Sequence, residues 1–130
     1  MKRFCFLIFL LFSTHSVIAA VGAPCGDYGE CDTFKPQLTN IESLQLGALT
    51  FINHCYGCHS LKYSRWARIS KDLDIPEKIL TENLVFGSDV KLGDRMTGSM
   101  QPAVSESWFG IAPPDLTLVT RLHGSDWVYT

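Results

Sequence analysis

The sequence has little net charge, no internal repeat and no uninterrupted apolar run long enough to cross a membrane. Its 130 residues carry 11 Lys and Arg against 13 Asp and Glu, a net charge of −2. This balance suggests neither a nucleic-acid-binding surface nor a polyacidic tail, and repeats at the spacings of solenoid proteins are missing. With 46% hydrophobic and 18% charged residues, the chain is too apolar for disorder. Its length suits one small domain around a core.

Residues 1–20 have the features of a secretory signal peptide. Lys2 and Arg3 precede an apolar run that is interrupted at Ser13, and the small residues Ala19 and Ala20 suit cleavage by signal peptidase after either of them. An uncleaved membrane anchor is the alternative, but a span needs about 20 apolar residues. Once Lys2 and Arg3 leave, nine basic residues remain against 13 acidic ones, so the mature chain carries −4. That charge slightly favours a basic partner.

Export changes what the cysteines imply, because disulfides persist outside the cytoplasm. Cys5 leaves with the signal, and two pairs remain, Cys25 with Cys31 and Cys55 with Cys58. If Cys55 and Cys58 have another use, Cys25 and Cys31 are the two cysteines left to pair with each other. Closing that short loop stabilises the fold by about 2 kcal/mol through the lost entropy of the unfolded chain. We therefore predict a Cys25–Cys31 disulfide, with a reduced, flexible N-terminal segment as the alternative.

The second pair lies in Cys-Tyr-Gly-Cys-His, residues 55–59, which is the attachment signature for c-type haem. The thiols of Cys55 and Cys58 add across the two haem vinyl groups, and their spacing matches the separation of those groups along one porphyrin edge. His59 is then aimed at the iron as the proximal ligand. The sequence thus predicts one covalent haem c as the cofactor.

Three other uses of this motif are possible in principle: a structural disulfide, half of a zinc site, or a thioredoxin-like redox pair. A second zinc-binding pair is missing, because Cys25 and Cys31 are six residues apart. No βαβ pattern surrounds the motif, as a thioredoxin fold requires. Haem fits best, and a thiol-disulfide oxidoreductase remains an alternative.

Apolar spacing predicts a mostly α-helical domain with long loops and no convincing strand. A capping box over residues 39–42 begins one amphipathic helix that delivers Cys55. The basic stretch over residues 62–71 is typical of a solvated helix face, with docking to a partner as the alternative. Further helices are expected after Asp74 as cap, and over residues 102–109 and 115–122. We expect a loop over residues 89–98.

Iron in an electron carrier needs a second axial ligand, and the downstream candidates are Met96, Met100 and His123. Spacing favours Met100. A thioether raises the reduction potential, whereas His123 would give a lower-potential bis-histidine site. Both methionines are alternatively gap-filling side chains beside the porphyrin.

Four segments resemble cytochrome c1, the haem subunit of the quinol:cytochrome c oxidoreductase complex (complex III). The first runs from Leu44 to Tyr63 and contains the haem motif. The others, in the same order as in that family, are residues 93–97, 108–117 and 121–129. The C-x-x-C-H motif occurs in every c-type cytochrome. The segment Ala-Pro-Pro-Asp-Leu-Thr, followed by Arg121 and then Asp-Trp, is much more specific.

The resemblance implies a c-type cytochrome fold around the haem, with similarity over about residues 40–130. Carried over by position, Cys55 and Cys58 bind the haem and His59 ligates its iron. Pro113 and Pro114 wall the pocket. Arg121 faces a propionate, where a fixed guanidinium pairs with the carboxylate.

The resemblance also implies a single-electron relay at the periplasmic face of the bacterial inner membrane. A Rieske iron-sulfur protein reduces the haem, a soluble or tethered cytochrome c removes the electron, and cytochrome b is a further partner. The chain is then no enzyme on its own and binds no nucleic acid. Its haem environment, including Arg121, tunes the potential.

The family takes its axial methionine from a segment beyond residue 130, and its membrane anchor from a helix further on. We therefore expect the N-terminal half of a longer cytochrome c1, with a signal peptide (1–20), an extension (21–38) and an incomplete haem domain (39–130). Such a fragment leaves the iron accessible on one face and the helix before Cys55 without its packing partner. A truncated gene product is one alternative. The other is a free-standing periplasmic cytochrome that uses Met100 or Met96.

Overall fold

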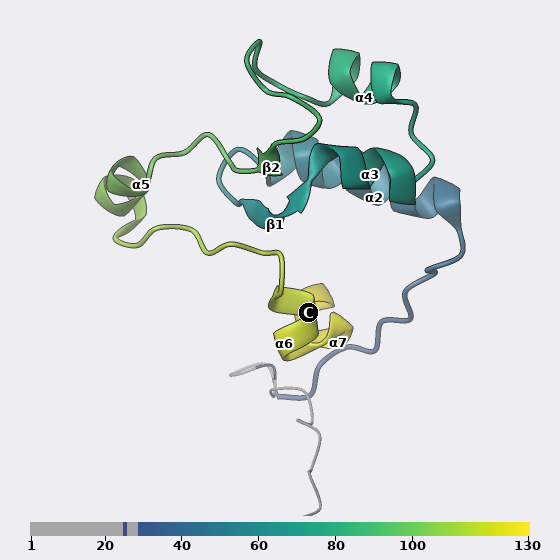
Figure 1. Ribbon diagram of the computed structural model, residues 1–130. Helices are drawn as coiled ribbons and strands as arrows, with labels where there is room; N and C mark the ends of the chain where they lie inside the picture. Colours follow the sequence, from purple (N-terminus) through teal and green to yellow (C-terminus); the bar gives the residue numbers. More distant parts are fainter. Residues whose placement is uncertain (1–24, 26–28) are drawn as a thin grey trace, which may run out of the picture.

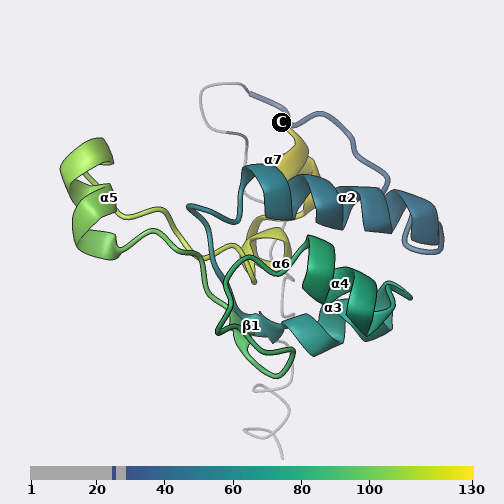
Figure 2. The same ribbon diagram turned by 90° about the horizontal axis from the view of Figure 1, so that it is seen from above.

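The computed structural model describes residue 25 and residues 29–130, so the predicted signal peptide lies outside the described residues. The described part contains six helices and two short strands: α2 (Ile41–His54), β1 (Leu61–Arg65), α3 (Trp66–Asp72), α4 (Glu77–Asn83), β2 (Arg95–Met96), α5 (Pro102–Phe109), α6 (Val119–His123) and α7 (Ser125–Tyr129). Helices α2, α3 and α4 gather around the sheet, whereas α5 stands apart (Figures 1 and 2). The fold is helix-rich with long loops and one small sheet, which is compatible with a c-type cytochrome fold.

Helix α2 leads directly into the cysteine motif. Its N-cap is Asn40, whose side chain accepts a hydrogen bond from the backbone N–H of Ser43 at 3.0 Å. The predicted capping box is therefore wrong by one residue, because Asn40 rather than Thr39 meets the free N–H groups of the first turn. At the other end Cys55 is the C-cap, and its N–H donates to the carbonyl of Phe51. The predicted helix that delivers Cys55 is confirmed.

A two-stranded antiparallel sheet corrects two sequence expectations. Leu61 pairs with Met96 and Arg65 pairs with Arg95, with an irregularity in the register between them. Residues 61–65 are therefore strand rather than solvated helix, and residues 89–98 are not loop throughout. The partner strand is only two residues long and lies about 30 residues away, so no alternating pattern reveals it.

A small core fixes the end of α2 against the sheet and the next two helices. It consists of six buried side chains: Ile52, Trp66, Ile75, Leu80, Leu84 and Met96. Gln45 on α2 also donates to the carbonyl of Leu73 at 2.7 Å, just beyond α3. The haem motif therefore starts from a well-anchored helix end.

The remaining helix ends follow the sequence signals only in part. Asp74 is not the cap of α4; it adopts a positive φ of 52°, and α4 begins after Pro76. Gly110 ends α5 in the left-handed conformation at φ 77°, as predicted. Helix α6 begins at Val119 rather than at residue 115, because Asp115 makes other hydrogen bonds, described below.

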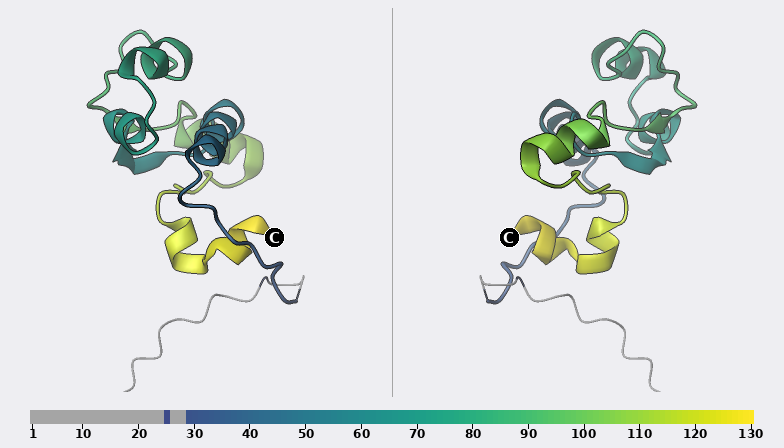
Figure 3. Two further views of the ribbon diagram at one scale, coloured as in Figure 1. Left: turned by 90° about the vertical axis from the view of Figure 1, so that its right-hand side faces the viewer. Right: turned by 90° about the vertical axis from the view of Figure 1, so that its left-hand side faces the viewer.

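Residues 29–38, called the N-terminal segment below, lie beside α7 (Figure 3). Cys25 and Cys31 form a disulfide with their Cα atoms 5.3 Å apart. The N–H of Phe34 donates to Asp126 Oδ1 at 3.0 Å, and its ring stacks on Tyr129 with centroids 4.9 Å apart. These contacts join the two ends of the described chain. Over residue 25 and residues 29–130, no helix has the length and apolar character needed to cross a bilayer.

Candidate functional site

The cysteine motif forms a run of turns directly after α2. The N–H groups of Cys58 and His59 both donate to the carbonyl of Cys55, at 3.1 and 2.9 Å. Neither Cys55 nor Cys58 is in a disulfide; Cys55 is half-buried and Cys58 is exposed. Reactive cysteines of thioredoxin type sit at helix N-termini, where the helix dipole stabilises the thiolate. This motif instead follows the C-terminus of α2.

His59 is held by a single hydrogen bond from its ring. Its Nδ1 lies 2.8 Å from the carbonyl oxygen of Pro114. A carbonyl only accepts, so Nδ1 is the donor in this contact. In the neutral imidazole with this tautomer, Nε2 is the nitrogen with a lone pair. A metal-ligating histidine commonly has this arrangement: the ring N–H that does not face the metal donates to a backbone carbonyl, a carboxylate or water. The motif therefore offers one imidazole nitrogen and two thiols that are not in a disulfide.

These groups fit an attached haem better than a directly bound metal ion. Within the described residues no group of three or more His, Cys, Asp or Glu side chains could hold an ion. A covalent haem needs only two thiols and one axial nitrogen from this motif. Cys55 and Cys58 provide the two thiols, and His59 provides the nitrogen.

A second segment, residues 97–100, packs against the motif. Tyr56 donates its hydroxyl proton to the carbonyl of Thr97 at 2.8 Å, and the N–H of Gly98 donates to Ser60 Oγ at 2.8 Å. A Cβ at Gly98 would lie 2.7 Å from the Tyr56 carbonyl oxygen, so the two backbones approach closely here. Burial raises the pKa of Tyr56 above its ordinary value.

The candidate axial ligands lie in three different environments. The backbone N–H of Met100 donates to the carbonyl of Gly57 at 3.2 Å, which holds Met100 next to the motif. Met100 is half-buried. Met96 is 1% exposed and belongs to the core. His123 stacks on Trp127, with ring centroids 4.2 Å apart. Among the three, Met100 is the one whose backbone is bonded to the motif.

The other residues carried over from the resemblance are placed with less constraint. Pro113 is half-buried, and the ring of Pro114 is exposed while its carbonyl meets His59. Arg121 lies exposed on α6, and no acceptor pairs with its guanidinium in the described chain. Its predicted role toward a propionate stays a prediction.

Sequence reasoning gave no individual role to Asp115, which links the motif region to the segment after it. One carboxylate oxygen accepts from the N–H of Lys62 at 2.7 Å and the other from the N–H of Thr117 at 3.1 Å. Burial alone would raise the pKa of Asp115, but these hydrogen bonds and the nearby Lys62 charge outweigh it and lower the pKa. The sequence Asp-Leu-Thr at residues 115–117 could have predicted the second of these bonds, because an Asp side chain commonly accepts a hydrogen bond from the backbone N–H two residues later.

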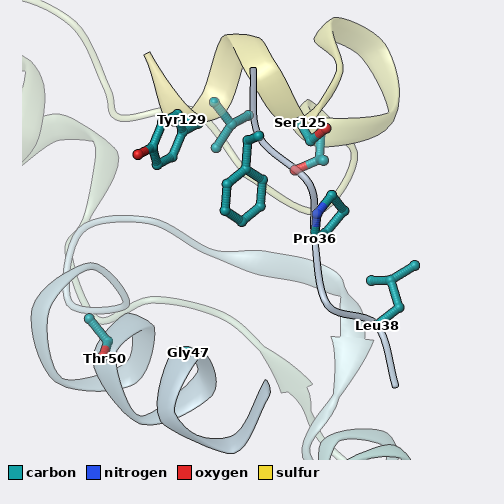
Figure 4. A pocket seen from close by; sticks show the side chains of 9 residues that line it. Pro36, Leu38, Gly47, Thr50, Ser125 and Tyr129 are labelled. Atoms are coloured by element: carbon teal, nitrogen blue, oxygen red, sulfur yellow. The ribbon is translucent and has the colours of Figure 1, made fainter. Parts of the chain in front are cut away.

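An apolar cavity of about 920 Å³ separates α2 from the last two helices (Figure 4). Gly47 and Thr50 of α2 line one side, and residues of α6, α7 and the N-terminal segment line the others. Neither thiol nor His59 lines it. At Gly47 a Cβ would meet nothing within 4 Å. This side of α2 is therefore open to the cavity.

Comparison with known proteins shows two relatives, whereas no family profile matches the chain. The chain is 45% identical over all 130 residues to cytochrome c1 of Allochromatium vinosum. It is 38% identical over 89 residues, 68% of its length, to the ammonia monooxygenase gamma subunit of Nitrosomonas europaea. It spans 51% of the first curated relative and 37% of the second. The resemblance predicted from the sequence is confirmed: over its whole length this chain is similar to a cytochrome c1, of which it spans about half.

Proposed function

We propose that this chain carries one covalent haem c and transfers single electrons as part of a cytochrome c1. Its main support is the hydrogen bond between His59 Nδ1 and the carbonyl of Pro114, which leaves Nε2 available as a ligand in the same motif as the free thiols of Cys55 and Cys58. The similarity to cytochrome c1 is the second support, because it covers every residue of the chain.

The chain's own residues would hold and orient the group rather than carry out bond chemistry on a substrate. Cys55 and Cys58 would attach it covalently, and His59 would supply a nitrogen ligand to its iron. Pro113 and Pro114 would wall the haem pocket, and the guanidinium of Arg121, which has no partner among the described residues, would bind a propionate. Haem itself supplies a one-electron couple whose potential the axial ligands and their hydrogen bonds adjust.

We place this relay at the periplasmic face of the membrane, in a complex with cytochrome b and a Rieske iron-sulfur protein. The Rieske protein donates the electron, and a soluble or tethered cytochrome c accepts it. The name of the full-length relative supports this assignment. The ammonia monooxygenase gamma subunit supports the assignment less, because it matches 68% of the chain and at lower identity.

The first test is on the axial histidine. The chain is produced in a host with c-type haem maturation, together with His59→Ala and His54→Ala as the matched control. His54 is exposed in the last turn of α2, four residues before Cys58. We expect the parent and His54→Ala to share one haem spectrum and His59→Ala to lose the axial nitrogen signature. An unchanged His59→Ala spectrum contradicts the proposal.

Carbon monoxide then tests the sixth position of the reduced protein. Ready binding means an open face and supports the cytochrome c1 interpretation, in which the second ligand comes from elsewhere. Resistance to carbon monoxide that Met100→Ala abolishes would instead support the free-standing carrier. If the protein folds without haem and keeps two titratable thiols, the result supports the alternative function of a thiol-disulfide oxidoreductase.

A further inference from the structure

The carbonyl that holds His59 belongs to a segment with no helix or strand of its own. Residues 110–118 lie between α5 and α6 without regular structure (Figure 1). Pro113 and Pro114 fix their own φ angles but donate no backbone hydrogen bond. The position of the Pro114 carbonyl relative to His59 therefore depends on contacts made by the residues that follow it.

Those contacts centre on Asp115. Its Oδ2 accepts from the N–H of Lys62 at 2.7 Å, which ties it to strand β1. Its Oδ1 accepts from the N–H of Thr117 at 3.1 Å, which closes a local turn. The N–H of Leu116 donates to the carbonyl of Ser60 at 2.9 Å. The residues after Pro114 are thus bound to the residues after His59.

The other hydrogen bonds between residues 115–117 and residues 60–63 are longer or use backbone atoms only. Thr117 Oγ1 accepts from the N–H of Tyr63, but at 3.4 Å, which is long for such a bond. The Leu116 bond uses backbone atoms alone. Among the described residues, Asp115 is the one side chain that accepts hydrogen bonds both from β1 and from its own segment.

We propose that Asp115 is a positioning residue, which fixes the Pro114 carbonyl against His59 and so sets the orientation and basicity of the imidazole toward an attached haem. This inference rests on the proposed function. A hydrogen bond from the outer nitrogen raises the basicity of a ligating histidine. A more basic ligand stabilises ferric iron, so a loosened Pro114 carbonyl should raise the reduction potential.

Three variants of the haem-loaded protein test this. Asp115→Ala removes both hydrogen bonds, and Asp115→Asn keeps one acceptor oxygen and the shape of the side chain. Asp94→Ala is the matched control, because Asp94 Oδ2 also accepts a backbone N–H, from Lys91 at 2.8 Å, in a different loop. The readouts are the reduction potential and the exchange rate of the His59 Nδ1 proton in the reduced protein.

We expect Asp115→Ala to raise the potential by up to about 59 mV, which is a tenfold change in the ferric-to-ferrous ratio for one electron. The Nδ1 proton should exchange faster. Asp115→Asn should shift the potential less in the same direction, and Asp94→Ala should leave both readouts at the parent values. If charge alone acted, Asp115→Asn and Asp115→Ala would shift the potential equally.

Equal shifts in the two Asp115 variants, no shift in either, or the same shift in Asp94→Ala would each overturn the inference. If Asp115→Ala does not fold, the Nδ1 exchange rate of Asp115→Asn decides it. Exchange faster than in the parent and in Asp94→Ala supports the inference, and exchange at the parent rate overturns it. A parent chain without covalent haem would remove the proposed function and this inference together. That failure shows in the parent, whereas failure of the inference alone shows only in the variants.

Discussion

At the scale of single residues, the closest approach beside the haem motif is at Gly98. A Cβ there would lie 2.7 Å from the backbone carbonyl of Tyr56, so Gly98→Ala must push the two segments apart. We expect a loss of about 1–3 kcal/mol in the free energy of unfolding, as for other overpacked sites. Gly93→Ala is the control, because nothing lies within 4 Å of its Cβ position. Equal urea midpoints for the two variants would contradict this packing.

Asp115 gives a residue-scale prediction in acid that needs no haem spectrum. Burial opposes its ionisation, but hydrogen bonds from Lys62 and Thr117 and the Lys62 charge keep its pKa below the ordinary value. The stability from Asp115 is therefore full above about pH 3.9, its ordinary pKa, and is lost as pH falls through the lower folded value. Asp115→Asn should be less stable than the parent at neutral pH, and the difference should shrink in acid. Thermal unfolding at several pH values measures it; a constant difference would contradict it.

At the scale of elements, α7 depends on the N-terminal segment. Five residues are too few for a stable isolated helix, and the stacking of Phe34 on Tyr129 and its bond to Asp126 supply the missing contacts. Phe34→Ala should cost about 0.5–1.5 kcal/mol and speed amide exchange in α7. Phe86→Ala, at a 60% exposed ring without a ring contact, is the control. Unchanged exchange in α7 would contradict this dependence.

Elements with local signals were predictable from the sequence, and elements made by distant contacts were not. The spacing of apolar residues gave α2, and Pro102 with Gly110 gave α5. Strand β2 is too short to show a pattern and exists through pairing with β1. The motif at residues 55–59 was visible in the sequence, but the carbonyl that orients His59 comes from a segment 55 residues away.

At the scale of the whole molecule, the core is small for the apolar surface that the chain presents. Six side chains form the buried cluster, while Trp108, Ile111 and Leu122 are 69%, 72% and 70% exposed. An attached haem would supply apolar contacts that the protein core lacks. The haem-loaded chain should therefore unfold at a higher temperature than Cys55→Ser/Cys58→Ser, which cannot attach haem. Equal midpoints would mean that haem adds nothing to this fold.

The most direct test of a covalent c-type haem is extraction of the purified, exported protein with acidified acetone. Haem held by thioether bonds to Cys55 and Cys58 stays with the polypeptide, and the intact mass equals that of the processed chain plus one haem. The double variant Cys55→Ala/Cys58→Ala should lose all colour to the organic phase. If the parent also loses its haem, or never acquires any while folding normally, the covalent haem assignment is contradicted.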